Sequence, residues 1–319
     1  MPVISSDGTR IAGNVIDPVT GKSSPSYCST ATGTWTALPD YGSSTAGAGD
    51  TYGAAGTVWA MSSNGNYVAG YAYNGGVGLT NVCASIWNVQ IGTITNLGPS
   101  TQSGPNSQSR VNAISDNGLV AGGRGGNNLG LIRTDPTGSG TYTRTLIANE
   151  GMVQAVSADG VWAGGIGGSA TNNDAYRCNV QTNTVQSLGR LNTSDLGGCI
   201  SAISADGSVI VGYEDACGGS PQEGTGFIWR AGIGMQTFDS SQASYGIDLN
   251  NTLNFVTPPD VSADGLSFTG FGYAPGSSIG QGWYVSIAGL APVPEPSSYA
   301  MLAAGLGLPG FVARRRRAR

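Results

Sequence analysis

The chain has 319 residues, 53 of them glycine and only 10% of them charged, which suits one large all-β domain or two ordinary domains. Its formal net charge of −5 argues against a nucleic-acid partner, because phosphates require a basic protein face. Histidine is absent, which excludes a Ser-His-Asp mechanism and removes the commonest metal ligand.

A five-residue phrase recurs along the chain. It reads ISSDG at Ile4, MSSNG at Met61, ISDNG at Ile114, VSADG at Val156, ISADG at Ile203 and VSADG at Val261. Asp-Gly and Asn-Gly supply the positive φ angles of a tight hairpin turn, and the preceding serine can bond back to that turn. A repeated calcium loop would need oxygen ligands at dense alternate positions, which do not recur here. The phrase therefore predicts six hairpin turns.

A second pattern follows each phrase, with the form strand, short turn, strand. ASIWNVQIGTITNLG from Ala84 is one example and GFIWRAGIGMQTF from Gly226 is another. Each repeat thus predicts four short strands, and four-stranded units of about 40–50 residues are propeller blades. We expect an all-β propeller of about six four-stranded blades over residues 1–290, with repeats starting near 3, 60, 113, 155, 202 and 260. The combination of the phrase with a later Ala-x-x-Trp and Leu-Gly resembles the HAF-type repeats of bacterial extracellular proteins, which implies an extracellular location.

The five cysteines are Cys28, Cys83, Cys178, Cys199 and Cys217. They lie far apart without a CxxC pair, which argues against a zinc site. One or two disulfides in an oxidising compartment remain open, as do small buried thiols. No cofactor is expected.

The candidate ligand site is the face that carries the long connections. In a four-stranded meander, alternate connections lie on opposite faces, and binding residues usually sit on the variable ones. The candidate residues on this face are Asp17, Tyr73, Asp174, Glu214, Asp215 and Tyr273. A glycoside hydrolase or polysaccharide lyase would need paired carboxylates there, whereas the adjacent Glu214 and Asp215 are more typical of a solvated loop. We therefore expect a binding or structural propeller, with a glycan-active enzyme as the alternative.

The C-terminal segment combines three features in a fixed order. A proline clip comes first, then an uncharged apolar run, then a block of arginines. The residues of the clip and the block are Pro294, Glu295 and Pro296, and Arg314, Arg315, Arg316 and Arg317. The run is at the short limit for a membrane-spanning helix, and the arginines would mark its cytoplasmic side. We expect a Pro-rich motif and linker at 291–296, a transmembrane helix at 297–313 and a cytoplasmic arginine cluster at 314–319.

The same three features resemble the PEP-CTERM sorting signal of Gram-negative bacteria. The resemblance implies that the helix holds the protein transiently in the inner membrane and that the arginines stop transfer. It further implies that an exosortase, a transpeptidase, cuts at the Pro-Glu-Pro site. Export then leads to the cell surface or the extracellular matrix, often alongside exopolysaccharide. The alternative is a single-span membrane protein that is never cleaved.

Export requires a signal, and residues 1–30 contain no basic start followed by an apolar run. The last repeat also reaches the proline clip without a clear fourth strand. We expect that the natural chain begins upstream of Met1, with a signal peptide and an outer strand that completes the sixth blade. The alternative is a poor fourth strand at 290–293 and another export route.

Overall fold

The computed structural model describes residues 2–16, 21, 23–41, 56–73, 82–98, 109–125, 129–171, 173–192, 197–214, 224–248, 254–274 and 279–289. Within these residues the protein is built almost entirely of short antiparallel strands. The predicted all-β class is confirmed.

Six sheets follow one another along the chain, and each is a meander of consecutive strands. The first three blades contain β1 (Val3–Ile4), β2 (Arg10–Ile16), β3 (Ser23–Ser29) and β4 (Trp35–Ala37); β5 (Gly56–Met61), β6 (Tyr67–Tyr73), β7 (Val82–Asn88) and β8 (Thr93–Asn96); and β9 (Arg110–Ile114), β10 (Val120–Arg124), β11 (Leu129–Thr134) and β12 (Thr143–Gly151). The last three contain β13 (Val153–Val156), β14 (Trp162–Gly165), β15 (Tyr176–Asn179) and β16 (Thr184–Ser187); β17 (Gly198–Ile203), β18 (Val209–Glu214), β19 (Thr225–Arg230) and β20 (Gly234–Thr237); and β21 (Asn254–Val261), β22 (Ser267–Tyr273) and β23 (Gly280–Ser286). Two short helices interrupt the strands, η3 (Ser169–Thr171) and α1 (Phe238–Ala243).

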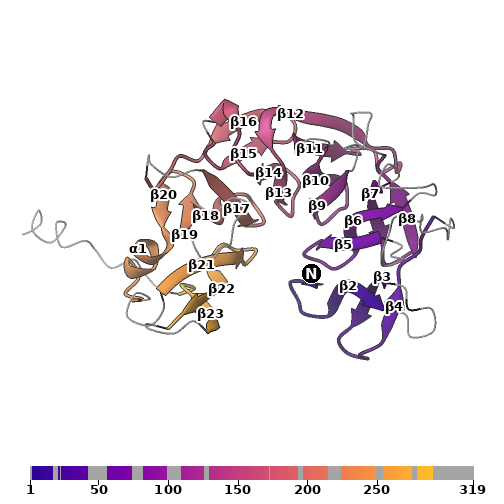
Figure 1. Ribbon diagram of the computed structural model, residues 1–319, viewed down its shortest axis with the longest axis horizontal. Coiled ribbons are helices and arrows are strands. Elements are labelled where there is room, and N and C mark those ends of the chain that lie inside the picture. Colours follow the sequence, from indigo (N-terminus) through magenta and orange to yellow (C-terminus); the bar gives the residue numbers. More distant parts are fainter. Residues whose placement is uncertain are drawn as a thin grey trace, which may run out of the picture.

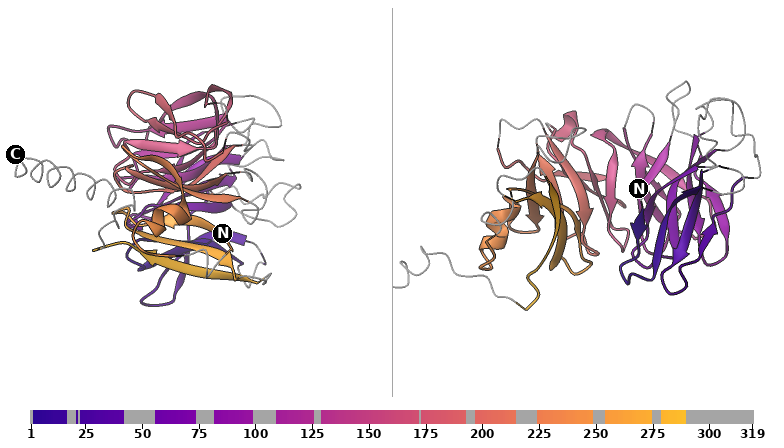
Figure 2. Two further views of the ribbon diagram at one scale, coloured as in Figure 1. Left: turned by 90° about the vertical axis from the view of Figure 1, so that its left-hand side faces the viewer. Right: turned by 60° about the horizontal axis from the view of Figure 1, so that its bottom comes forward.

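The blades form a propeller whose ring is open on one side. The first strand of each blade lies nearest the centre, and the first and sixth blades stand at the two ends of an arc (Figure 1). The turned view in Figure 2 shows the same separation between the first blade, in indigo, and the sixth, in gold. The prediction of six blades is confirmed. The sixth sheet has three strands within the described residues, and the chain from residue 290 onward lies outside them.

The recurring phrase forms the predicted hairpin turn at the start of every blade. In the fifth blade the Ser204 hydroxyl donates to Asp206 Oδ1 (2.8 Å) and accepts from the N–H of Val209 (3.0 Å). Gly207 has φ +72°, a left-handed conformation that glycine adopts without steric cost. The same serine-to-Asp or serine-to-Asn bond recurs in the other five turns. Local side-chain chemistry therefore fixes the turn that separates the first two strands of each blade.

The core consists of hydrophobic clusters between successive blades. The cluster between the fifth and sixth blades joins Val211, Ile228 and Phe238 to Phe268 and Val285, all at most 7% exposed. Similar clusters fill the four preceding junctions, between blades one and two, two and three, three and four, and four and five. Each blade therefore gains its stability from its neighbours as well as from its own sheet.

Three cysteines, Cys28, Cys83 and Cys178, carry free buried thiols, whereas Cys199 is disulfide-bonded. Both alternatives left open by the sequence thus occur in one chain. None of the helices in the described part of the chain is both long and apolar enough to cross a membrane. The expected transmembrane helix at 297–313, the Pro-Glu-Pro motif and the arginine cluster lie outside the described residues.

Candidate functional site

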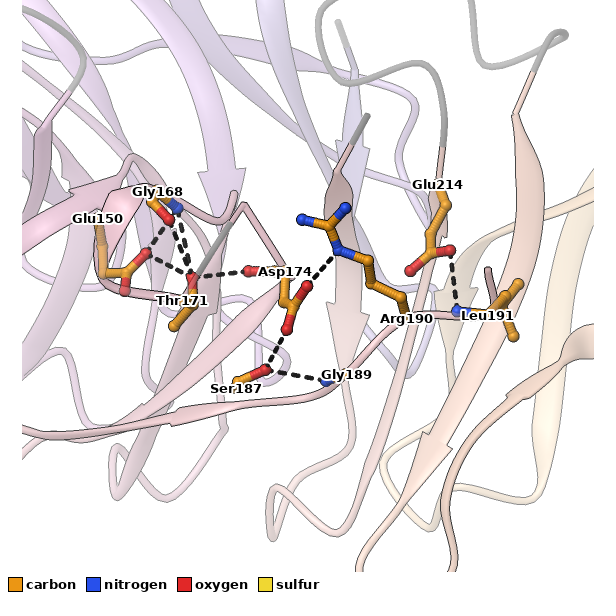
Figure 3. Close-up of polar contacts among 9 residues, drawn as sticks. All are labelled: Glu150, Gly168, Thr171, Asp174, Ser187, Gly189, Arg190, Leu191 and Glu214. Atoms are coloured by element: carbon orange, nitrogen blue, oxygen red, sulfur yellow. Dashed lines mark hydrogen bonds and ion pairs between the residues drawn. The ribbon is translucent and has the colours of Figure 1, made fainter. Parts of the chain in front are cut away.

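Charged side chains gather at the long-loop ends of the third, fourth and fifth blades (Figure 3). We call this group the carboxylate cluster, and it consists of Glu150, Thr171, Asp174, Arg190 and Glu214. Glu150 lies in β12, Thr171 ends η3, and Glu214 ends β18. Asp174 and Arg190 lie on the connections before β15 and after β16. Three blades thus contribute to one neighbourhood.

Glu150 anchors the connection between β14 and β15. Its Oε2 accepts hydrogen bonds from the N–H of Gly168 (2.7 Å) and the hydroxyl of Thr171 (3.0 Å). The side chain is 1% exposed, and burial raises the pKa of its carboxyl even though these two hydrogen bonds act in the opposite direction. Its Oε1 is buried and has no hydrogen-bond partner among the described residues. Glu150 therefore holds a loop in place and is not accessible to a ligand.

Glu214 has the corresponding role at the next junction. Its Oε2 accepts from the N–H of Leu191 (3.0 Å), and its side chain is fully buried. It thereby fixes the segment that leads from the fourth blade to the fifth. A carboxylate that accepts a backbone N–H is a strong, charge-assisted anchor.

Asp174 and Arg190 form the accessible part of the cluster. The Arg190 Nε donates to Asp174 Oδ1, and the hydroxyl of Ser187 donates to Asp174 Oδ2 (2.6 Å). The side chain of Arg190 is 18% exposed and that of Asp174 is 17% exposed. Ser187 in turn accepts from the N–H of Gly189 (3.1 Å), so the group is tied to the backbone after β16. Figure 3 shows the Arg190 guanidinium between Asp174 and Glu214.

The cluster contains two of the residues predicted for the ligand face, Asp174 and Glu214. Tyr73 ends β6 in the second blade and packs edge-on against Tyr71, with ring centroids 5.9 Å apart. Tyr273 ends β22 in the sixth blade, so neither tyrosine shares the blades of the cluster. Asp17 and Asp215 lie outside the described residues.

Glu150, Thr171 and Arg190 were not predicted from the sequence. Arg190 could have been found from the sequence, because it is a charged residue directly after the Leu-Gly that ends a repeat, in a chain with few charges. No such signal marked Glu150, because its partners come from a different blade. In the described part of the chain, no group of three or more Cys, Asp or Glu residues is arranged to hold a metal ion.

Comparison with known proteins gives one match of sequence and several of fold. Residues 292–317 match the family model described as the PEP-CTERM protein-sorting motif. No curated protein matches the chain in sequence.

Three solved structures illustrate the similarity of fold. The β-propeller domain of the Trilobed protease from Pyrococcus furiosus, which has an open velcro topology, gives a TM-score of 0.50 at 11% identity, over 92% of this chain and 83% of that one. A prolyl endopeptidase structure gives a TM-score of 0.53 at 11% identity, over 92% of this chain and 40% of that one. TolB from Acinetobacter baumannii gives 0.45 at 15% identity over 71% of this chain and 52% of its own, so the chain spans about half the length of that protein. Identities this low show the fold alone. The chain is thus a six-bladed β-propeller that carries a PEP-CTERM sorting motif, which implies an exported protein processed by an exosortase.

Proposed function

We propose that the chain is an exported cell-surface or extracellular-matrix protein whose propeller binds polysaccharide, or another surface component, without catalysis. The observation that carries this proposal is the match of residues 292–317 to the sorting motif. In this proposal the segment at 297–313 holds the protein transiently in the inner membrane. Exosortase then recognises Pro294 to Pro296, and the propeller is the part that reaches the surface.

The accessible pair in the carboxylate cluster supports binding on the long-loop face. Asp174 offers acceptor oxygens and Arg190 carries donor N–H groups, and both side chains are partly exposed. Sugar hydroxyls can serve as donors and acceptors, so a glycan can pair with both. Because Glu150 and Glu214 fix the surrounding connections, this pair is presented on a rigid surface, which lowers the entropy lost on binding.

The state of the carboxylates supports a non-catalytic role. Glycoside hydrolysis requires two carboxyl groups that flank the scissile bond. Glu150 and Glu214 are buried and hold backbone amides, and Asp174 is engaged by Arg190 and Ser187. These contacts favour structural anchoring over proton transfer to a substrate.

Cell fractionation tests the sorting part of the proposal. Deletion of Val293–Arg319 should release the propeller in soluble form, whereas the full chain should pass through a membrane-bound stage before it reaches the surface. If the truncated chain is anchored and sorted like the full one, the tail is not the address.

Binding to the exopolysaccharide of the producing organism tests the second part. Arg190→Met should weaken retention on immobilised polysaccharide, and Arg144→Met, which removes an exposed arginine of β12, serves as the control. Equal retention of both variants would exclude the cluster as the contact. Release of reducing or unsaturated sugar ends from the polysaccharide would support the enzyme alternative instead.

A further inference from the structure

The junction between the sixth and first blades lacks the contacts that repeat at every other junction. In five blades, the second residue after the turn glycine packs against the turn glycine of the next blade. These pairs are Arg10 and Gly65, Tyr67 and Gly118, Val120 and Gly160, Trp162 and Gly207, and Val209 and Gly265. The corresponding residue of the sixth blade is Ser267, and no atom of the described residues lies within 4 Å of the position that a Cβ on Gly8 would occupy. The open side of the ring is therefore reflected in the side chains.

Backbone hydrogen bonds between neighbouring turns end at the same place. The N–H of Ser6 donates to the C=O of Ser63 (2.8 Å), and the series continues as far as the N–H of Ala205 and the C=O of Ala263 (3.0 Å). Between the second and third turns the backbone N–H donates to a side chain instead, that of Asp116. Both turns at the open junction belong to the described residues, and no backbone hydrogen bond joins Ala263 to the turn of Ser6. The five hydrophobic clusters of the described core likewise stop at the sixth blade.

The sixth blade carries polar residues at positions of its exposed face where the fifth blade carries apolar ones, although Phe271 of β22 lies on the same face. Val211 and Ile228 pair across β18 and β19 and are buried against the sixth blade. The corresponding pair across β22 and β23 is Thr269 and Tyr284, and Tyr284 is 66% exposed. The Tyr284 hydroxyl donates to Ser267 Oγ (3.2 Å). A face of this kind suits contact with water or with a polar ligand better than contact with another blade.

A cavity of about 610 Å³ lies at this open junction and extends to the centre of the ring. Its walls at the junction include Ile4 and Ser6 of the first blade, and Asp264, Ser267, Thr269 and Tyr284 of the sixth. The volume is within the usual range for ligand pockets, about 300–1,000 Å³.

The lining chemistry narrows the class of ligand. Among the described residues that line the cavity there is neither lysine nor arginine, whereas Asp260 and Asp264 are present. The hydroxyl of Ser262 and the N–H of Leu266 lower the pKa of Asp264, so this carboxyl is ionised at neutral pH and repels anions. The hydroxyls of Ser6 and Thr269 can donate and accept, whereas the hydroxyl of Ser267 already donates to Ser286 Oγ (3.0 Å) and accepts from Tyr284. The exposed ring of Tyr284 offers a flat apolar surface.

We infer that this cavity is a second binding site, separate from the carboxylate cluster, and that it takes a neutral, hydroxyl-rich ligand such as a segment of an uncharged glycan. Sugar hydroxyls match the wall hydroxyls, and the apolar face of a sugar ring stacks on Tyr284. An acidic glycan is disfavoured because its charge is repelled by Asp264 and the described lining residues include no lysine or arginine to offset that repulsion.

Isothermal titration of the full chain tests this inference, with short neutral oligosaccharides of glucose, mannose or galactose as probes and oligogalacturonate as the acidic comparison. We expect at least one neutral probe to bind and oligogalacturonate to bind at least about tenfold more weakly. Tyr284→Ala should lower the affinity for the neutral probe by about tenfold or more, and Tyr284→Phe, which keeps the ring, should retain most of that affinity. Trp35→Ala removes an aromatic side chain that is 43% exposed on β4 and serves as the matched control.

Several outcomes would overturn the inference: no neutral probe binds, the acidic probe binds equally well, or Tyr284→Ala binds as the unchanged chain does. Circular dichroism of Tyr284→Ala confirms that any lost affinity is not lost folding. The Arg190→Met variant separates the two sites. If Arg190→Met abolishes binding and Tyr284→Ala does not, the carboxylate cluster is the glycan site and the cavity is not. If only Tyr284→Ala loses binding, the cavity inference stands without the cluster.

Discussion

The substitution Gly207→Ala measures how closely successive blades are packed. Gly207 has φ +72°, and a Cβ added there would lie 2.4 Å from Cδ1 of Trp162 in the preceding blade. The positive φ lowers the free energy of unfolding by about 1 kcal/mol for an alanine, and overpacking against the partly buried Trp162 ring lowers it by about 1–3 kcal/mol more. Gly207→Ala is therefore expected to lower the free energy of unfolding by about 2–4 kcal/mol in total.

Gly8→Ala is the matched control. Gly8 occupies the same turn position with φ +69°, but no atom of the described residues lies within 4 Å of its added Cβ. Gly8→Ala should lower the free energy of unfolding only by the cost of the positive φ, about 1 kcal/mol.

Thermal unfolding followed by circular dichroism compares the two variants. At roughly 2–4 °C per kcal/mol for a large domain, Gly8→Ala should lower the Tm by about 2–4 °C and Gly207→Ala by at least about twice as much. Equal Tm shifts in the two variants would refute the packing argument, since both share the backbone strain and differ only in the neighbouring blade.

Three further predictions concern the sorting motif, a turn carboxylate and the open junction. Glu295→Ala should leave an uncleaved, membrane-bound form on immunoblots of cell fractions, and normal processing would contradict the sorting assignment. In the folded state the pKa of Asp206 is lowered from 3.8, chiefly because its carboxylate accepts a hydrogen bond from the backbone N–H of Ser208. The ionised carboxylate therefore stabilises the fold above pH 3.8, and this contribution is lost as the pH falls through the lowered pKa. Asp206→Asn, which copies the residue found in the second and third blades, should therefore lose less stability than the unchanged chain between pH 7 and pH 3 in urea unfolding; an equal loss would contradict the linkage. A triple variant, Ser267→Val, Thr269→Val and Tyr284→Ile, gives the sixth blade apolar residues at the positions where the fifth blade has them. Small-angle scattering should then show a closed ring or self-association, and a scattering profile identical to that of the unchanged chain would contradict this prediction.

The repeated blades were predictable because their determinants are local. Each turn is specified by a serine, an Asp or Asn two residues later, and a glycine with positive φ, all within a few positions in the sequence. The carboxylate cluster was only partly predictable. Its position at the ends of strands placed Asp174 and Glu214 on the long-loop face, but their partners come from other segments. Thus Glu214 accepts from Leu191, and Asp174 pairs with Arg190 after β16.

The sequence suggested a solvated loop for Glu214 and Asp215, and the role of Glu214 in the fold differs from that prediction for the same reason. A carboxylate on a loop reads as solvated when only its neighbours in sequence are considered. In the fold, Glu214 is fully buried and supports the backbone of the segment before the next blade. Burial depends on which segments meet in space, and a single repeat does not contain that information.

The open junction could have been found by aligning the repeats with one another. Val209, Val211 and Ile228 of the fifth blade correspond to Ser267, Thr269 and Tyr284 of the sixth. In a closed ring every blade needs an apolar face toward the next, whereas the last unit of a linear array needs a polar outer face.

This reasoning also separates two features of the sixth blade. An added fourth strand would pair with the backbone edge of β23 and would satisfy its unpaired N–H and C=O groups. The polar residues Ser267, Thr269 and Tyr284 point from the face of the sheet, at right angles to that pairing. Completion of the sixth blade by another strand would therefore leave the face toward the first blade polar and its cavity accessible, so the edge of β23 and the cavity can be tested independently.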